Sequence, residues 1–226
     1  MDDAASLIRS GALSRGDAAV SDVNAQRVAL DAVRPGSLLE VGAGRGTKTF
    51  VMAAAAARRE LSRDHVALDL SEEKCQLNRS RLERAGLDAG IRVIAGDATD
   101  LDRALAPLDG EAGEKRQFDT VLLDAPCSGT GTMRRHPEIP WRLTENTVLH
   151  DLPRLQRRLL AEAASRVASG GRLVYATCSV LAPENDGVVD AFLASAEGSP
   201  FKPVSHSQTV PAPGDFDGHY HVVLER

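Results

Sequence analysis

The sequence predicts a single α/β domain built around a mostly parallel β-sheet. Short apolar segments with the length of strands alternate with longer segments that have the periodicity of helices, and this alternation is typical of a parallel sheet with helices on both faces. Glycine or acidic residues follow several of the predicted strands, at the edge of the sheet where such folds bind ligands. The 226 residues are enough for one such domain.

Each element is predicted from its own local pattern. Parallel strands are expected at residues 37–41, 65–69, 91–95, 120–124 and 172–176. A final strand at residues 219–224 is expected to be antiparallel and to form an edge of the sheet. Helices are expected at residues 23–33, 48–61, 71–85 and 152–167, and after Pro183. Ser71 is a suitable N-cap, while Gly86 and the pair Gly170–Gly171 end helices. Residues 108–117 are expected to form a loop, residues 1–35 a helical lead-in, and residues 36–226 the main domain.

Composition limits the class of protein. The chain is 42% hydrophobic and 26% charged, as in ordinary soluble proteins, and it has no apolar run of membrane-spanning length and no signal peptide at its start. We therefore expect a cytoplasmic protein without a membrane partner. Cys75, Cys127 and Cys178 lie far apart without C-x-x-C spacing, which argues against disulfides and against a bound metal. The formal net charge of −5 counts against nucleic-acid binding, since RNA-binding proteins usually have a basic surface.

A glycine-rich turn and three acids indicate an adenosine-containing cofactor. Gly42, Gly44 and Gly46 follow the first strand with the spacing G-x-G-x-G, which differs from the dinucleotide fingerprint and by itself equally fits a tight turn. Asp69, Asp97 and Asp124 end the next three strands. An acid at the second strand can hold a ribose diol and one at the third can accept from an adenine amino group. Each alone is more often a helix cap or a surface carboxylate, but three in succession favour a ligand site.

Two further sequence blocks carry a family resemblance. They are Asp124-Ala125-Pro126-Cys127-Ser128-Gly129-Thr130-Gly131, followed by Arg134-Arg135-His136-Pro137-Glu138-Ile139, and Leu173-Val174-Tyr175-Ala176-Thr177-Cys178-Ser179-Val180. From about Val20 to the C-terminus, the chain resembles the Sun/RsmB family of RNA cytosine-5 methyltransferases. The resemblance implies a Rossmann-like fold, S-adenosylmethionine as cofactor, and RNA, with ribosomal RNA favoured, as partner. We expect a monomer.

The resemblance also implies roles for three residues. Cys178 is the nucleophile, Cys127 promotes release of the product, and Asp124 contacts the cytosine near the cofactor methyl. A thiolate that adds to carbon 6 of cytosine makes carbon 5 nucleophilic, and a second thiol can assist the later loss of a proton. DNA cytosine methyltransferases use the cysteine of a Pro-Cys motif as nucleophile, so the reverse assignment stays open. Cys75 has no motif around it and is expected to be a core or surface thiol.

The cofactor contacts that the resemblance implies lie at four strand ends. They are Glu40, Gly42, Ala43, Gly44, Arg45, Gly46, Thr47, Lys48, Asp69, Leu70, Asp97, Ala98 and Asp124. The family pattern at the glycine turn is Asp-x-Cys-Ala-Ala-Pro-Gly-Gly-Lys-Thr. Here Glu40 replaces the Asp, the Cys and the Pro are lost, and the bulky Arg45 enters the turn. Contact through the backbone should survive these changes. Lys48 is expected beside the cofactor carboxylate or the target base.

Several basic residues are candidates for RNA contact. They are Arg134, Arg135, His136 and Arg142, with Trp141 to stack a base, whereas Arg154, Arg157 and Arg158 fit a solvated helix face. Family members usually carry an additional N-terminal RNA-binding region, so we expect this chain alone to bind RNA weakly. Transfer RNA is the alternative substrate. A non-catalytic assembly factor that binds RNA or protein, and a small-molecule methyltransferase, are the alternative functions.

Overall fold

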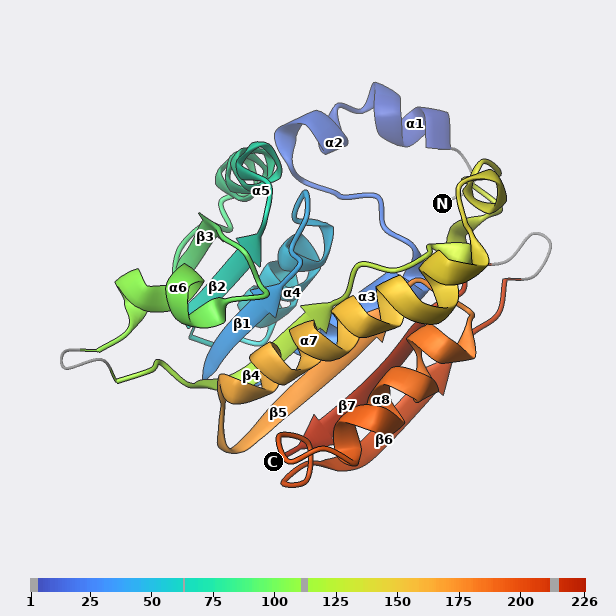
Figure 1. Ribbon diagram of the computed structural model, residues 1–226. Helices are drawn as coiled ribbons and strands as arrows, with labels where there is room; N and C mark the ends of the chain where they lie inside the picture. The colour runs from blue at the N-terminus through green and yellow to red at the C-terminus, as the bar shows by residue number, and fades with distance from the viewer. Residues whose placement is uncertain (1–3, 63, 111–113, 212–215) are drawn as a thin grey trace.

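The computed structural model describes residues 4–62, 64–110, 114–211 and 216–226. Its centre is a seven-stranded sheet with the order β3-β2-β1-β4-β5-β7-β6 (Figure 1). The strands are β1 (Ser37–Val41), β2 (Asp64–Asp69), β3 (Ile91–Ala95), β4 (Phe118–Asp124), β5 (Val167–Thr177), β6 (Lys202–Gln208) and β7 (Tyr220–Glu225). Strands β1 to β5 pair in parallel, and β7 pairs antiparallel with both β5 and β6. The predicted mixed, mostly parallel sheet is confirmed.

Helices cover both faces of the sheet. They are α1 (Ala4–Arg9), α2 (Ala12–Arg15), α3 (Val23–Asp31), α4 (Thr47–Arg58), α5 (Glu72–Arg84), α6 (Leu101–Leu105), α7 (Leu152–Ser165) and α8 (Asp186–Leu193). Short helical turns are η1 (Ala106–Leu108), η3 (Thr130–Thr132), η4 (Ile139–Trp141), η5 (Thr147–Asp151) and η6 (Ala182–Glu184). Side chains of α6, α7 and α8 form the core on one face, and those of α3, α4 and α5 form it on the other.

Strand β4 shows how the two cores are separated. Val121 and Leu123 belong to the core beneath α7, while Leu122 belongs to the core beneath α3 and α4, because successive side chains of a strand point to opposite faces. All three are fully buried, as expected for a parallel strand covered on both sides. Helix α3 precedes residue 35 and packs into the same core as the sheet. The division of the chain at residue 35 stays a prediction.

Helix α5 has the ends that its sequence predicts. The Ser71 side chain accepts a hydrogen bond from the backbone N–H of Lys74, as an N-cap does, and Gly86 follows with φ +61°. Helix α3 begins after a similar cap, since Asp22 accepts from the N–H of Asn24.

The end of α7 and the start of β5 differ from the prediction. Helix α7 ends at Ser165, and Gly170–Gly171 lie within β5 instead of ending a helix. The pairing of β5 with β4 shifts in register across this segment, and Gly170 has φ +73°, so these glycines serve an irregular strand. The predicted loop 108–117 includes residues 111–113, which lie outside the described residues.

The C-terminal strand is antiparallel as predicted, but it does not form the edge of the sheet. Strand β7 lies between β5 and β6, so β6 forms this edge of the sheet. The sequence analysis missed β6. All but one of the residues in β6 are exposed, and Pro203 lies within it. An exposed edge strand has no buried face to produce an alternating pattern, and Pro is tolerated there.

Candidate active site

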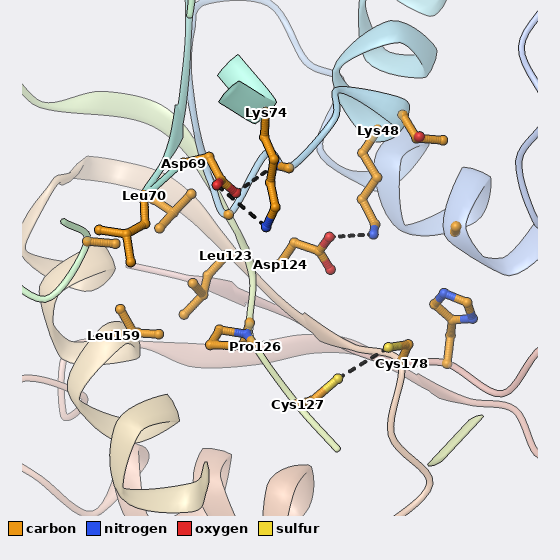
Figure 2. A pocket seen from close by; sticks show the side chains of 18 of the residues that line it. Lys48, Asp69, Leu70, Lys74, Leu123, Asp124, Pro126, Cys127, Leu159 and Cys178 are labelled. Carbon is orange, nitrogen blue, oxygen red and sulfur yellow. Dashed lines mark hydrogen bonds and ion pairs between the residues drawn. The ribbon is translucent and has the colours of Figure 1, made fainter. Parts of the chain in front are cut away.

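A cavity of about 940 Å³ opens at the carboxyl ends of the parallel strands, where α/β sheets of this type bind their ligands. Figure 2 shows side chains that line it. The predicted site residues that line the cavity are Gly42, Gly44, Thr47, Lys48, Asp69, Leu70, Asp97, Ala98, Asp124, Cys127 and Cys178. The strand ends therefore bring together all three residues that were assigned to catalysis and most of those assigned to the cofactor.

Four residues assigned to the cofactor do not line this cavity, namely Glu40, Ala43, Arg45 and Gly46. Glu40 is fully buried and accepts a hydrogen bond from Thr49 Oγ1 at 2.7 Å, with His65 Nε2 at 3.3 Å. Gly46 has φ +79°, and a Cβ there would lie 1.9 Å from Asn78 Oδ1. Glu40 and Gly46 therefore support the turn through contacts outside the cavity. A direct contact with the cofactor stays a prediction for all four residues.

The glycine turn is fixed against its neighbouring strands by backbone contacts. Gly42 has φ +81°, and a Cβ there would lie 2.4 Å from the carbonyl oxygen of Asp124, so glycine is required. The N–H of Gly44 donates to Asp69 Oδ2 at 2.8 Å. Because these contacts use the backbone, the turn keeps its place although its side chains differ from the family pattern.

Two acids stand at one end of the cavity. Asp69 Oδ1 accepts from the N–H of Ser71 at 3.0 Å, and Lys74 Nζ lies 3.8 Å away. Asp97 Oδ1 accepts from both the N–H and the hydroxyl of Thr99 at 2.8 Å, and these bonds lower the pKa of its carboxyl. Both groups present carboxylate oxygens to the cavity, and their contacts with a ribose and an adenine amino group stay predictions.

Apolar side chains form the walls between these acids and the rest of the cavity. Leu70, Leu123, Pro126 and Leu159 face this space (Figure 2). A slot with apolar walls and a few polar groups is the usual environment of a bound nucleoside. The residues at this end therefore fit an adenosine-containing cofactor.

A lysine and an acid form an ion pair farther along the cavity. Lys48 Nζ lies 2.6 Å from Asp124 Oδ2, and their side chains are 13% and 30% exposed. Burial alone would lower the pKa of Lys48, but the Asp124 carboxylate raises it above its usual value. Lys48 is thus a fixed cation near Cys178.

The two motif cysteines meet at the ends of β4 and β5. Their sulfur atoms are 3.3 Å apart (Figure 2). The pKa of Cys178 lies below its usual value, chiefly because Cys127 donates a hydrogen bond to its sulfur and further because Lys48 is near; burial and Asp124 act in the opposite direction. The pKa of Cys127 lies well above its usual value, because it gives this hydrogen bond and is buried. These shifts favour Cys178 as the thiolate of the pair.

One buried carboxylate joins the loops that carry the cysteines. Glu184 is fully buried, and its Oε2 accepts from the N–H of Ser128 at 2.8 Å while its Oε1 accepts from the hydroxyl of Ser179 at 2.7 Å. These serines directly follow Cys127 and Cys178. Gln156 of α7 donates to the same carboxylate and to the carbonyl of Pro126, each at 2.9 Å. The carboxylate therefore ties the two cysteine loops to each other and to α7.

The sequence analysis missed Glu184. Its position just after Pro183 was interpreted only as the start of a helix. The signal that was present is an acid six residues after Cys178 in chain order, but its partners Ser128 and Gln156 are distant in sequence. Asn185 extends the same support, since it accepts from Thr177 Oγ1 at 2.7 Å and donates to the carbonyl of Ser179 at 3.0 Å.

The remaining candidates divide between the cavity and the surface. Arg134 and Arg135 line the cavity, while Trp141 is 90% exposed on η4. Cys75 is fully buried in the core between α5 and the sheet, so it is a core thiol. Among the described residues, no cluster of His, Cys, Asp and Glu side chains could hold a metal ion. No helix in these ranges is long and apolar enough to cross a membrane.

The fold and this cavity define a methyltransferase of the Rossmann-like class, and S-adenosylmethionine is its cofactor. The model of the family described as 16S rRNA methyltransferase RsmB/F matches residues 27–215. The chain therefore belongs to the RsmB/F methyltransferase family, as the motif resemblance predicted.

Curated relatives share the family. The chain is 34% identical over 214 residues to ribosomal RNA small subunit methyltransferase B of Salmonella arizonae, covering 91% of this chain and 46% of the relative. It is 37% identical over 194 residues to the protein of that name from Escherichia coli O6:K15:H31, covering 83% and 41%. The chain thus spans less than half the length of these two relatives.

Solved structures confirm the fold. The crystal structure of PH0851 has a TM-score of 0.82 and 26% identity, and the match covers 97% of this chain and 49% of that one. NSun6 from Pyrococcus horikoshii with SFG has a TM-score of 0.75 and 22% identity, with 95% and 54% covered. These similarities extend over nearly the whole of the present chain.

Proposed function

We propose that this protein transfers a methyl group from S-adenosylmethionine to carbon 5 of a cytosine in RNA, through a covalent bond to Cys178. The observation that carries the proposal is the pair of sulfur atoms 3.3 Å apart, beside the Lys48–Asp124 ion pair and in one cavity with Asp69 and Asp97. A methyl transfer to oxygen or nitrogen needs no thiol nucleophile. Ribosomal RNA is the favoured substrate, because the curated relatives are named for it.

The reaction begins at Cys178. Its thiolate forms a bond to carbon 6 of the cytosine, and the electron pair of the ring double bond becomes available at carbon 5. S-adenosylmethionine, when bound, would supply the electrophilic methyl group to carbon 5 and leave as S-adenosylhomocysteine. Lys48, paired with Asp124, lowers the pKa of Cys178, and this favours the thiolate before attack.

Asp124 is placed to hold the base. Within the described residues only its Oδ2 makes a hydrogen bond, to Lys48, so Oδ1 remains to accept from the cytosine amino group. A hydrogen bond there would orient the ring for attack by Cys178. The base must be unpaired or flipped out of its stack to reach this position.

Cys127 acts after methyl transfer. Its pKa is raised chiefly by the hydrogen bond to the Cys178 thiolate, and that cause disappears once the Cys178 sulfur is bonded to carbon. Cys127 can then lose its proton to solvent and accept the proton from carbon 5. The ring double bond re-forms as the Cys178–carbon bond breaks, which releases methylated RNA and the Cys178 thiolate.

Covalent trapping tests this proposal. The protein is incubated with S-adenosylmethionine and with small-subunit ribosomal RNA or transfer RNA that contains 5-fluorocytidine, in which fluorine blocks the elimination step. We expect a protein–RNA band on a denaturing gel for wild type and for Cys127→Ala but not for Cys178→Ala. Loss of the band only in Cys127→Ala would reverse the assignment of the nucleophile.

The same experiment separates the alternative functions. A stronger band with transfer RNA would change the substrate class but keep the reaction. No band with either RNA, while the cofactor still binds, would favour the non-catalytic assembly factor. Methyl transfer to a small molecule that survives in Cys178→Ala would favour the third alternative. A monomeric state and a cytoplasmic location stay predictions.

A further inference from the structure

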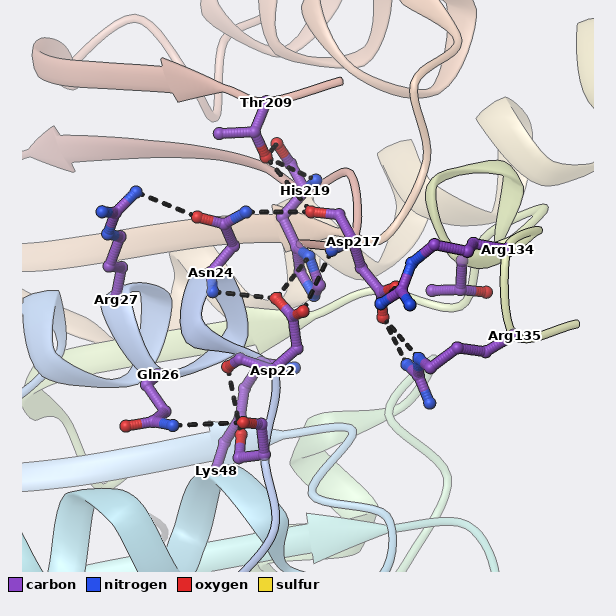
Figure 3. Close-up of polar contacts among 12 residues, drawn as sticks. Asp22, Asn24, Gln26, Arg27, Lys48, Arg134, Arg135, Thr209, Asp217 and His219 are labelled. Atoms are coloured by element: carbon purple, nitrogen blue, oxygen red, sulfur yellow. Dashed lines mark hydrogen bonds and ion pairs between the residues drawn. The ribbon is translucent and has the colours of Figure 1, made fainter. Parts of the chain in front are cut away.

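The cavity extends past Cys178 to a polar wall that the proposed chemistry does not use. This wall is made by two arginines that follow η3, Arg134 and Arg135. They face Asp217 and His219, which precede β7, and Asp22 at the start of α3 (Figure 3). All of these except Asp217 line the cavity.

We propose that Arg134 and Arg135, held in place by Asp217, form a subsite for a phosphodiester group directly next to the nucleotide whose base reaches Cys178. This subsite rests on the proposed function, because it presumes an RNA substrate. Asp217 is a positioning residue in this scheme, since its carboxylate lies behind the arginines and is not among the groups that line the cavity.

Asp217 is a fixed, fully buried anchor. Its backbone N–H donates to Asp22 Oδ2 and its carbonyl accepts from Asn24 Nδ2, each at 2.9 Å. Its side chain is 0% exposed. Arg135 Nε donates to Asp217 Oδ2 at 2.8 Å, and the Nη2 group of Arg135 donates to the same oxygen. A buried carboxylate held on both sides by α3 thus sets the direction of the Arg135 guanidinium.

Arg134 is held far less tightly. Its Nη2 lies 3.5 Å from Asp217 Oδ1, an ion pair without a hydrogen bond, and that buried oxygen has no hydrogen-bond partner. Within the described residues, Arg134 makes no hydrogen bond at all. The side chains of Arg134 and Arg135 are 45% and 51% exposed. Both guanidinium groups therefore retain N–H donors for a ligand.

The charges at this wall favour an anion. Two arginines share one carboxylate, Asp217. The other nearby acid, Asp22, uses both oxygens on the backbone N–H groups of Asn24 and Asp217, and it caps the positive end of the α3 helix dipole. The pKa of His219 lies below its usual value, because burial and then Lys48 lower it. Asp22, 3.8 Å away, offsets only part of this shift. His219 therefore adds no charge at neutral pH.

The anion that fits best is a phosphodiester. The planar fork of a guanidinium matches two phosphate oxygens, and such contacts position a nucleic acid without reading its sequence. The cavity is continuous from these arginines to Cys178, so a phosphate held here belongs to the nucleotide that enters it or to its neighbour.

Neutralising single phosphates tests the subsite. Short single-stranded oligoribonucleotides with one 5-fluorocytidine carry a neutral methylphosphonate on the 5′ or on the 3′ side of that nucleotide, and the rate of adduct formation is measured. For wild type, we expect one of the two neutral linkages to slow the reaction by about tenfold to a hundredfold, as for the loss of a charged hydrogen bond. For Arg134→Ala/Arg135→Ala, the all-phosphate RNA should be slowed similarly, and the neutral linkage should add less than about a twofold effect.

Two further variants make the test specific. Arg134→Ala alone leaves the Arg135–Asp217 contact intact, so it folds even if the double variant does not, and it should show part of the same loss. Arg154→Ala/Arg157→Ala removes the same charge from exposed positions of α7 outside the cavity and should keep the full methylphosphonate effect. The Kd for S-adenosylmethionine should not change in any variant, and weaker cofactor binding in Arg134→Ala would assign these arginines to the cofactor carboxylate instead.

The outcomes separate the two proposals. Adducts that form with wild type and remain equally sensitive to the neutral linkage in Arg134→Ala and in the double variant would overturn the subsite alone. No adduct with wild type on the all-phosphate RNA would overturn the proposed function and the subsite with it.

Discussion

The two ends of the cavity are built in different ways. At the cofactor end, the contacts use the backbone, as where the N–H of Gly44 and the N–H of Ser71 both donate to Asp69. At the cysteine end, a buried acid joins residues that are far apart in sequence, since Glu184 holds Ser128, Gln156 and Ser179.

The difference follows from what each end must do. A cofactor can be held by backbone groups whatever the side chains are, so this end tolerates the altered residues around Arg45. Two sulfur atoms must instead share one proton at a fixed separation, and only a rigid support can hold them so. We therefore expect substitutions at the cysteine end to affect folding and thiol chemistry together, and substitutions at the cofactor end to affect ligand affinity alone.

The largest effect is expected for Glu184→Ala. It removes the acceptor of the Ser128 N–H and one of the partners of the Gln156 amide and of the Ser179 hydroxyl, and the loss of these buried hydrogen bonds should cost about 3 kcal/mol of unfolding free energy. Denaturant unfolding measures this loss. As a control, Glu197→Ala at an exposed position should change the free energy of unfolding by less than about 0.5 kcal/mol. Equal stability of the two variants would show that the cysteine loops hold themselves.

Cys127→Ala should make Cys178 less reactive without unfolding the protein. The hydrogen bond from Cys127 is the main reason that the pKa of Cys178 is low, so its removal raises that pKa. Because the thiolate forms as pH rises through the pKa, the midpoint of alkylation of Cys178 by iodoacetamide should move to higher pH. Mass spectrometry of the alkylated peptide follows this rate against pH. A midpoint that stays in place would mean that Lys48 alone stabilises the thiolate.

Asp69→Asn should weaken the cofactor site and leave the thiols unchanged. The amide keeps one oxygen for the turn but loses the charge that favours a ribose hydroxyl, so the Kd for S-adenosylmethionine should rise by about tenfold. Calorimetry measures the Kd, and the alkylation profile of Cys178 serves as the internal control. A shifted profile would show that the two ends are coupled.

The smallest effect is expected for Arg45→Ala. The Arg45 side chain is exposed and lies outside the lining of the cavity, so the Kd for S-adenosylmethionine should change by less than about twofold. A larger change, measured in the same calorimetric experiment, would restore the direct contact that the family resemblance implies for this residue.

Local pattern predicted most of the fold. The first four parallel strands and the cap at Ser71 were found because a buried strand and a helix start each leave a signal within a few residues. Strand β6 was missed because its residues are exposed and leave no such signal. The end of α7 was placed too late because Gly170–Gly171 fit a helix stop as well as an irregular strand.

The sequence by itself determined which residues face the cavity at the strand ends, including Asp69, Asp97, Asp124 and the two motif cysteines. They follow apolar segments directly, and the carboxyl ends of parallel strands meet at one edge. Only the tertiary structure decided that the two sulfur atoms lie 3.3 Å apart, that Glu184 joins the two cysteine loops, and that Asp217 contacts Arg135. Each depends on burial and on contacts between residues that are distant along the chain, such as the 82 positions between Arg135 and Asp217, and no local pattern records such a contact.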